Sequence, residues 1–537
     1  MKDGFVRCAS ATVDIKVADT DYNTSNIIKA IEDAAQNNIK LIVFPELCIT
    51  GYTCGDLFLQ KILLDSAKDS LIKIAKATEN LDITAVVGLP YVAEQTLYNC
   101  AAVVNGGHIK GLVPKLNIPN YAEFYEVRHF TAGKNEVTYV NINGEEIPFG
   151  ANILFKTDAC EDFVLAVEIC EDLWTAMPPS VNHALAGATI IANLSASNEV
   201  IAKDEYREML VKSQSAKLYC GYIYSDAGYG ESTTDLVFAG DNMIAENGTI
   251  LARSKRFNNE CVYTELDLER LVGERKKSNT YNIVGSEKYM SVKLDMNIGD
   301  TKITRYVDKQ PFVPSDDKKR EKRSEEILSI QSLGLKKRLD HTHAKTAVVG
   351  VSGGLDSTLA LLVTVRAFDS LNLDRKNIIA VTMPCFGTTD RTYNNAVNFA
   401  NSLGVTLKEV NIKAAVNQHF ADIEHDPNVY DVTYENSQAR ERTQILMDVA
   451  NKSGGLVIGT GDMSELALGW ATYNGDHMSM YGVNAGVPKT LIRYLVDYEA
   501  KRTNNDILKK TLQDILDTPV SPELLPPKDG KISQKTE

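Results

Sequence analysis

The sequence lacks the features that would point to a membrane or to nucleic acid. No apolar stretch reaches the length of a transmembrane helix. Residues 1–12 carry charges without an apolar core, so we expect no signal peptide. The 57 basic residues are outnumbered by 71 acidic ones, and the net charge of −14 argues against a nucleic-acid partner. Small anionic substrates must therefore be held by local basic residues.

Paired cysteines and metal-ligand spacings are also missing. The nine cysteines include no CxxC pair, and the eight histidines show no zinc-site spacing. Cys48 and Cys54, beside Asp56, come nearest to a cluster, and we interpret them as structural. Single cysteines in apolar surroundings are typical of a reducing compartment, so we expect a cytoplasmic protein in which most cysteines are small buried apolar residues.

The 537 residues divide into two halves with different patterns of expected strands and helices. Short apolar strands alternate with helical segments up to about residue 274, and βα units repeat from about residue 325. Between the halves periodicity weakens, and residues 315–326 are almost wholly charged, which indicates a solvated linker or an exposed helix start. We therefore expect an α/β protein with a domain at 1–275, a linker at 276–324 and a second domain at 325–537.

Repeating βα units in the second half predict an open, Rossmann-like parallel sheet with ligands at the carboxyl ends of its strands. The expected order is helix 327–339, strand 346–351, helix 357–368, strand 378–383, helix 392–403, strand 406–410, helix 438–453 and strand 455–458.

The segment from Ala347 to Thr358 runs from a buried strand through Ser-Gly-Gly directly into a helix. A helix N-terminus presents unpaired N–H groups and partial positive charge, which together favour phosphate. Gly353 and Gly354 let the backbone approach an anion closely, and neighbouring hydroxyls add donors. Asp356 would repel phosphate unless a cation lay between them, so its presence predicts Mg²⁺.

This segment is not a Walker A loop. The string SGGLDS resembles the pyrophosphate-binding loop of the ATP pyrophosphatase superfamily, whose members split ATP to AMP and pyrophosphate while adenylating a carbonyl or carboxylate oxygen. The resemblance implies ATP binding at Gly350, Ser352, Gly353, Gly354, Asp356 and Ser357.

Three strands of the first half end abruptly in a reactive side chain, namely Glu46, Lys115 and Cys170. If these strands are neighbours in one sheet, the three side chains meet at a common edge. Cys170 as thiolate would attack a carbonyl carbon, Glu46 would take and return the proton, and Lys115 would face the oxyanion, with the N–H of Glu171 as second donor. Lys115 beside the sulfur would also lower the pKa of Cys170.

This constellation resembles the Glu–Lys–Cys triad of the nitrilase superfamily, amidases that cleave carbon–nitrogen bonds on an α-β-β-α sandwich. The strings FPELCITGYTCGDL, PKLNIPNYAEFYEVRHF and EICEDLW are similar to its glutaminase branch. The resemblance covers about residues 5–270. It implies Glu126 as a supporting carboxylate and Tyr121 at the pocket, with Ser197 and Lys203 holding the α-carboxylate and α-amino ends of glutamine. An Arg often stands where Lys203 does.

Several amidotransferases share the phosphate loop, so strings further along the chain must identify the acid that is amidated. Residues 434–442, 459–476 and 486–491 are similar to the NAD synthetase family. The resemblance implies ATP contacts at Thr460 and Lys489, deamido-NAD⁺ contacts at Asn436, Arg440 and Glu465, and an Mg²⁺ site at Asp356 and Glu465. Arg440 and Arg442 diverge by about 200° on one helix, so they cannot grip one phosphate from the same face.

Together these resemblances imply a glutamine-dependent ligase. Glutamine would be hydrolysed to ammonia at Cys170, deamido-NAD⁺ adenylated by ATP–Mg²⁺, and the adenylate amidated to NAD⁺ with release of AMP and pyrophosphate. An ammonia tunnel and a homo-oligomer are implied as well, without a tightly bound organic cofactor. Two alternatives stay open. One is an amidating ligase of the same superfamily with another acid acceptor, and the other is a glutaminase or assembly subunit with an inactive synthetase half.

The C-terminal string at residues 521–537 departs from the family pattern. In related synthetases this string is followed by a further helical segment, so we expect either a truncated or a naturally shorter protein. A shorter C-terminus would put two features in doubt, namely the lid over the synthetase site and the C-terminal oligomer contacts. It would not affect the glutaminase half.

Overall fold

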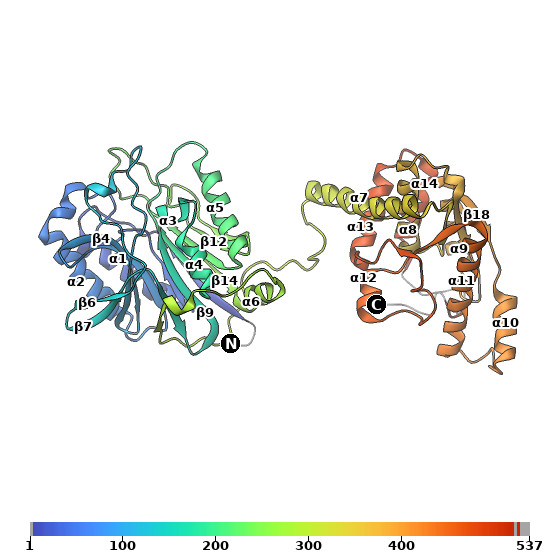
Figure 1. Cartoon of the computed structure of the whole chain (residues 1–537), viewed down its shortest axis with the longest axis horizontal. Coiled ribbons are helices and arrows are strands. Elements are labelled where there is room, and N and C mark those ends of the chain that lie inside the picture. Colours follow the sequence, from blue (N-terminus) through green and yellow to red (C-terminus); the bar gives the residue numbers. More distant parts are fainter. Residues whose placement is uncertain (1–3, 520–523, 527–537) are drawn as a thin grey trace. The chain divides into compact units, whose positions relative to one another are not determined.

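The structure is a computed structural model that describes residues 4–519 and 524–526 (Figure 1). The chain folds into two compact units, residues 1–306 and 307–537. We expected a shortened C-terminus from residues 521–537. Except for 524–526, these residues lie outside the described part of the chain.

Two sheets form the centre of the first unit. One contains, in spatial order, β14 (Cys261–Asp267), β1 (Phe5–Ala11), β2 (Leu41–Val43), β3 (Thr84–Ala93), β4 (Thr96–Asn105), β5 (His108–Pro114), β7 (Glu145–Phe149) and β6 (Thr138–Ile142). The other contains β13 (Thr249–Arg253), β12 (Met243–Glu246), β11 (Gly221–Asp226), β10 (Ile190–Ser195), β9 (Cys160–Ile169), β8 (Ile153–Thr157) and β15 (Met290–Lys293).

The two sheets pack face to face, because their strands are apolar on both sides. In β9, Leu165 and Val167 face a core shared with the other sheet, where they meet side chains such as Val43 of β2. The alternate residues Val164 and Ala166 join a second core beneath the outer helices. This two-residue period is that of a strand buried on both faces.

Helices cover the outer faces of both sheets. They are α1 (Thr20–Gln36), α2 (Lys61–Ala77), α3 (Glu171–Trp174), α4 (Pro179–Leu185) and α5 (Lys203–Leu218). A further helix, α6 (Leu268–Lys277), instead contributes Leu268 and Leu271 to the core between the sheets. Apolar residues of α1 and α2 share a core with one sheet, and residues of α4 and α5 share a core with the other. The layers are therefore helix, sheet, sheet, helix, which is the α-β-β-α sandwich that the nitrilase resemblance implied.

Part of the segment expected as a linker packs within the first unit. Strand β15 pairs in parallel with β8, Thr301 donates to the carbonyl of Phe5 at 2.8 Å, and Arg305 donates to Glu246 at 2.8 Å. The charged block at 315–326 is the start of a long helix, α7 (Asp317–Thr342), which Asp316 caps by accepting the N–H of Lys319.

A parallel sheet forms the centre of the second unit, as the βα pattern predicted. Its strands are, in spatial order, β18 (Thr406–Glu409), β17 (Ile378–Thr382), β16 (Thr346–Gly350), β19 (Gly455–Gly459) and β20 (Tyr481–Gly482). The helices are α7, α8 (Leu355–Ser370), α9 (Asp390–Leu403), α10 (Lys413–Asp422), α11 (Val432–Ser453), α12 (Met463–Leu468), α13 (Lys489–Arg502) and α14 (Asp506–Leu516).

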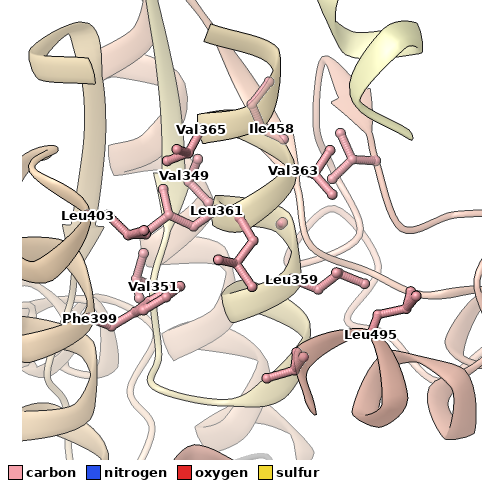
Figure 2. Packing of buried hydrophobic residues seen from close by; sticks show 14 of the residues in the cluster. Val349, Val351, Leu359, Leu361, Val363, Val365, Phe399, Leu403, Ile458 and Leu495 are labelled. Atoms are coloured by element: carbon pink, nitrogen blue, oxygen red, sulfur yellow. The ribbon is translucent and has the colours of Figure 1, made fainter. Parts of the chain in front are cut away.

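Helix α8 is buried almost all round, and its burial fixes the loop before it. Figure 2 shows Leu359, Leu361 and Val363 of α8 within a cluster of apolar side chains that includes Phe399 of α9 and Leu495 of α13. A helix held on several sides cannot tilt, so the N-terminal end of α8 has a fixed place at the carboxyl end of β16.

Among the helices described, none combines the length and the apolar composition needed to cross a membrane.

Candidate active sites

The three reactive side chains of the first unit come together, but from both sheets. Glu46 follows β2 and Lys115 follows β5, and in that sheet β3 and β4 lie between them. Cys170 follows β9 of the other sheet. The condition considered from the sequence, that the three strands are neighbours in one sheet, is therefore not met. The residues meet because the two sheets stack and present these strand ends at the same side of the sandwich.

Lys115 is an ammonium held between two carboxylates. Its Nζ lies 2.6 Å from Oε1 of Glu46 and 2.8 and 2.9 Å from the two carboxylate oxygens of Glu126. Lys115 is wholly buried, and Glu46 is 1% exposed. Glu126 is fixed in turn by the hydroxyl of Tyr52, which donates to its Oε1 at 2.8 Å. Glu126 therefore contacts Lys115, the residue that it was expected to support.

Glu46 is held by two further donors. The side-chain amide of Asn99 donates to Oε1 at 2.6 Å, and the backbone N–H of Ala196 donates to Oε2 at 3.0 Å. Burial raises the pKa of Glu46 to about 7, against the lowering effect of Lys115. Burial alone would lower the pKa of Lys115, but Glu126 and Glu46 outweigh it and hold that pKa well above its usual range. The site therefore contains a base that titrates near neutrality beside a permanent cation.

Cys170 occupies a strained turn between β9 and α3. Its φ of 44° and ψ of −98° are unusual for a residue with a side chain. Asp172 supports the turn because its carboxylate accepts the N–H of Ile169 at 3.0 Å and that of Asn117 at 2.9 Å. The N–H of Glu171 is the first of α3 and has no acceptor within the helix, which makes it available to an oxyanion.

Burial and neighbouring charges together shift the pKa of the Cys170 thiol. Burial raises its pKa well above the usual range, and Glu46 adds to that rise. Lys115 lowers the pKa, as the sequence suggested, but burial outweighs this effect and the net change is upward. Formation of the thiolate therefore requires a base, and Glu46 is the carboxylate whose pKa lies in the right range.

Two of the candidate glutamine ligands, Tyr121 and Lys203, lie close enough to Cys170 to be affected by the charge of its thiolate. Tyr121 is 54% exposed and donates to the carboxylate of Glu171 at 2.9 Å. Ser197 is buried, and its Oγ has no hydrogen-bond partner among the residues described. A buried hydroxyl without a partner is a natural contact for a polar ligand. Ser197 also directly follows Ala196, which binds Glu46.

Lys203 begins helix α5 and lies between polar and aromatic groups. Its Nζ donates to Oδ1 of Asn198 at 2.5 Å and lies 5.1 and 5.5 Å from the ring centroids of Trp174 and Phe124. Burial lowers the pKa of Lys203, and the negative charge of a Cys170 thiolate opposes that change. The ammonium of Lys203 is therefore close enough to the sulfur of Cys170 for the two charges to interact.

The phosphate loop of the second unit has the geometry that the sequence predicted. Gly353 has a φ of 86°, and a Cβ placed on it would lie 2.2 Å from the carbonyl oxygen of Thr392. The hydroxyls of Ser352 and Ser357 lie 3.2 Å apart, and the N–H of Gly354 donates to Ser352 Oγ at 3.2 Å. Gly350 ends β16, just before this loop. These internal hydrogen bonds hold the loop in one conformation.

A cluster of acids surrounds Lys489 at the same edge of the sheet. Its Nζ lies 2.6 Å from Asp356, 2.7 Å from Asp462 and 2.8 Å from Glu465. One ligand oxygen from each of these acids lies within 4.8 Å of the others, a spacing that suits a divalent cation. The Oδ1 of Asp356 is buried and unpartnered within the described part of the chain.

The pKa values of this cluster depend mainly on burial and on the attraction between Lys489 and the acids. Burial raises the pKa of Asp356 to about 6, Lys489 lowers it, and Glu465 and Asp462 raise it further. For Lys489, burial acts to lower the pKa, but Asp356 and the other acids outweigh it and the net change is upward. The ammonium thus compensates a group of acids that would otherwise repel one another.

Comparison with known proteins places both sites in one family. The carbon–nitrogen hydrolase family model matches residues 7–276, and the NAD synthase family model matches residues 327–511. A glutamine-dependent NAD(+) synthetase from Mycobacterium tuberculosis is 41% identical over 97% of this chain and 79% of the relative. The chain belongs to the glutamine-dependent NAD(+) synthetases.

Other members of the family agree with this assignment. A glutamine-dependent NAD(+) synthetase from Mycobacterium leprae is 39% identical over 99% of this chain and 81% of its own length. The corresponding synthetase from Aquifex aeolicus is 30% identical over 96% and 84%. A crystal structure of a glutamine-dependent NAD(+) synthetase from Cytophaga hutchinsonii is 26% identical, covers 96% of this chain and 84% of that chain, and gives a TM-score of 0.45.

The remaining residues suggested by the NAD synthetase resemblance fall into two groups. Thr460 lies beside the phosphate loop, because Asn484 donates to the carbonyl of Thr460 at 3.1 Å and to that of Asp356 at 2.9 Å. Asn436 and Arg440 lie on α11 and contact a different segment. Asn436 accepts from Thr472 at 2.8 Å, and Arg440 donates to the carbonyl of Tyr473 at 3.1 Å.

Sequence reasoning missed three polar residues of these NAD synthetase sites. Asn99 contacts Glu46 from the middle of β4, where its neighbours give no sign of function. Tyr52 contacts Glu126 from a loop. Asp462 completes the acidic cluster while also capping α12, with Glu465 closing the capping box. The capping pattern in the sequence would have located Asp462, although not its ion pair with Lys489.

Proposed function

We propose that the chain makes NAD⁺ from deamido-NAD⁺, ATP and glutamine, with the glutaminase in the first unit and the synthetase in the second. Family membership supports the overall reaction. The observation that carries the glutaminase half is the buried contact of 2.6 Å between Lys115 and Glu46, beside the strained turn at Cys170. The phosphate loop and its acids support the synthetase half.

Glutamine hydrolysis begins with proton transfer from the Cys170 thiol to Glu46. The sulfur then attacks the side-chain amide carbon of glutamine, and negative charge develops on the amide oxygen. Lys115 and the N–H of Glu171 stabilise this oxyanion. Glu46 returns its proton to the leaving nitrogen, so ammonia departs and a Cys170 thioester remains. Water, deprotonated by Glu46, cleaves the thioester to glutamate and the free thiol.

The amino-acid end of glutamine binds beside the sulfur. Lys203 supplies a cation for the α-carboxylate, and its contacts with Asn198 and Trp174 fix that ammonium before the substrate arrives. The unpartnered hydroxyl of Ser197 and the exposed ring of Tyr121 supply further polar contacts. A lysine serves where a guanidinium is common in related enzymes, and it gives one point charge instead of a planar fork.

In the second unit the loop at residues 352–357 binds the phosphates of ATP. Its backbone N–H groups and the N-terminus of α8 favour negative charge, and Gly353 keeps the backbone accessible. Asp356, Asp462 and Glu465 would hold Mg²⁺, which when bound neutralises the phosphates and pyrophosphate. The nicotinate carboxylate of deamido-NAD⁺ attacks the α-phosphorus of ATP, pyrophosphate leaves, and ammonia then displaces AMP.

Lys489 has two partners in this scheme. In the structure its ammonium is neutralised by the three acids. A divalent cation held by those acids would replace it there, and the ammonium could then face the phosphates of ATP. Asn436 and Arg440 on α11 hold deamido-NAD⁺ together with the segment at 472–473 that they contact.

We also propose the finer features that the resemblance implied. Ammonia that escapes into water is protonated and loses its nucleophilicity, which favours an enclosed route between the sites within a homo-oligomer. The nine cysteines, all described and all free, support a reducing compartment such as the cytoplasm.

An acceptor panel tests the synthetase assignment. The protein is incubated with ATP, MgCl₂ and ammonium chloride, and with deamido-NAD⁺, xanthosine monophosphate or aspartate as the acceptor. We expect equimolar AMP, pyrophosphate and NAD⁺ with deamido-NAD⁺ alone. AMP formation with another acid would instead support a different amidating ligase. Glutamine hydrolysis without AMP formation from any acid would identify a glutaminase whose synthetase half is inactive.

A further inference from the structure

A cluster of buried ionisable residues contacts the segment that carries Ser197, and the reaction as described does not use it. Its centre is Arg207 of α5, which is wholly buried. Nη1 of Arg207 lies 2.6 Å from Glu199, 2.8 Å from Asp241 and 3.7 Å from Asp226. Burying a guanidinium with three acids costs desolvation free energy. We therefore interpret the cluster as a device that fixes one conformation, not as a source of stability.

The cluster binds three consecutive residues, 197–199, which we call the turn. Asp226 accepts the backbone N–H of Ser197 at 2.8 Å. Nη2 of Arg207 donates to the backbone carbonyl of Asn198 at 3.4 Å, and its Nη1 binds the carboxylate of Glu199. The turn at 197–199, whose Asn198 also forms a β-bridge with Phe238, is thereby tied to Arg207 directly and through Asp226.

The same guanidinium also fixes the helix that carries Lys203. Arg207 stands four residues after Lys203 on α5, so the two side chains lie on one face of the helix. Lys203 in turn donates to the side chain of Asn198. Arg207 therefore fixes the distance between the turn and the helix. This distance determines how far the hydroxyl of Ser197 lies from the ammonium of Lys203.

We propose that Arg207 and Asp226 are positioning residues for the amino-acid end of glutamine, acting through Ser197, Asn198 and Lys203. This inference rests on the proposed glutaminase function and deepens it. The base is less dependent on the turn, because Glu46 is held by Lys115 and Asn99 in addition to Ala196. Loosening the turn should therefore weaken glutamine binding much more than it slows the chemical steps.

The test uses two conservative variants of the full-length protein. Arg207→Lys keeps the charge but cannot place two N–H groups on the acids and the turn at once. Asp226→Asn keeps an oxygen for the N–H of Ser197 but removes the charge facing Arg207. We expect each to raise KM for glutamine about ten-fold or more, with kcat changed less than about three-fold.

A matched control separates this role from general stability. Arg253 pairs with the same Asp241, at 2.7 Å, and otherwise with Asp204 and Glu208 on α5. Arg253→Lys makes the same chemical change in the same cluster away from the turn, and it should leave KM within about two-fold of wild type. The rate at which iodoacetamide alkylates Cys170 should be similar in all four proteins, because this small amide has no amino-acid end.

The outcomes are distinguishable. Wild-type KM in Arg207→Lys and Asp226→Asn overturns the inference, as does an equal rise in Arg253→Lys or a loss confined to kcat. Where Arg207→Lys does not accumulate as folded protein, Asp226→Asn decides. If the wild-type protein itself releases no ammonia from glutamine, the proposed function fails, and the inference with it.

Discussion

The ammonium of Lys489 lies 2.6 Å from a carboxylate oxygen of Asp356, inside a group of acids spaced to bind a divalent cation. If these acids hold Mg²⁺ as we propose, lysine and metal would compete for the same oxygens. An internal cation of this kind keeps the acids from repelling one another when no nucleotide is bound, and it must leave the cluster before a metal ion can enter.

Removing this ammonium should make the protein bind Mg²⁺ more readily without nucleotide. In Lys489→Ala the three acids lose their cation, so we expect millimolar MgCl₂ to raise Tm by several degrees, against a small change for wild type. Thermal unfolding with and without MgCl₂ measures this. Lys501→Ala, which removes an exposed lysine of the same helix, is the control. Equal Mg²⁺ effects in both variants would contradict the competition.

Gly353 should be intolerant of a side chain. Alanine there would adopt a φ of 86° and place its Cβ 2.2 Å from a backbone oxygen of Thr392. We expect a loss of about 1–3 kcal/mol in stability and a large loss of ammonia-driven NAD⁺ synthesis, with glutamine hydrolysis retained. Gly404→Ala has a similar φ of 74° but meets no atom within 4 Å, so it should keep its activity. Parallel loss in both variants would argue against a special role for the loop.

The pH dependence of glutamine hydrolysis should report Glu46. Because the base acts as a carboxylate and its pKa is raised to about 7, kcat/KM should rise as the pH increases through about 7. Asn99→Ala removes a hydrogen bond that lowers this pKa, so the midpoint should move to higher pH. The control Asn105→Ala changes another buried asparagine of β4 and should leave the midpoint in place. An unmoved midpoint in Asn99→Ala would rule out Glu46 as the titrating base.

Stability of the first unit should depend on pH through a second buried acid, Glu168. Burial raises its pKa from 4.5 to about 7. Since the folded state retains a proton that the unfolded chain releases, this group contributes stability below about 4.5 that is lost as the pH rises through 7. Glu168→Gln stays neutral, so its midpoint of urea unfolding should fall less between these pH values than that of wild type. Glu161→Gln, exposed on the same strand, should match wild type. A wild-type slope in Glu168→Gln would be inconsistent with this assignment.

Much of the second unit could be predicted from sequence because its information is local. The path from β16 through Gly353 into α8 is continuous in the chain, and each strand is followed closely by its helix. The reactive residues Glu46, Lys115 and Cys170 were also visible, since each ends an apolar strand. What could not be read was the pairing of those strands, because placing β2 and β9 in different sheets depends on contacts far apart in sequence.

The features that sequence reasoning missed also depend on contacts between residues far apart in the sequence. Asn99 lies within an ordinary apolar strand, and only its position opposite Glu46 gives it a function. The direction of the pKa change of Cys170 depends on its burial, which the sequence around it does not specify. Strand β15 is a short piece of an irregular segment, and its pairing with β8 is likewise a tertiary contact.

The most direct test of the two-site account is the nitrogen source used by a Cys170→Ala variant. NAD⁺ formation is measured with deamido-NAD⁺ and ATP–Mg²⁺, and with either glutamine or ammonium chloride. We expect the variant to lose glutamine-driven synthesis completely and to keep ammonia-driven synthesis near the wild-type rate. Glutamine-driven synthesis that survives in Cys170→Ala, or loss of both activities in the folded variant, would contradict the account.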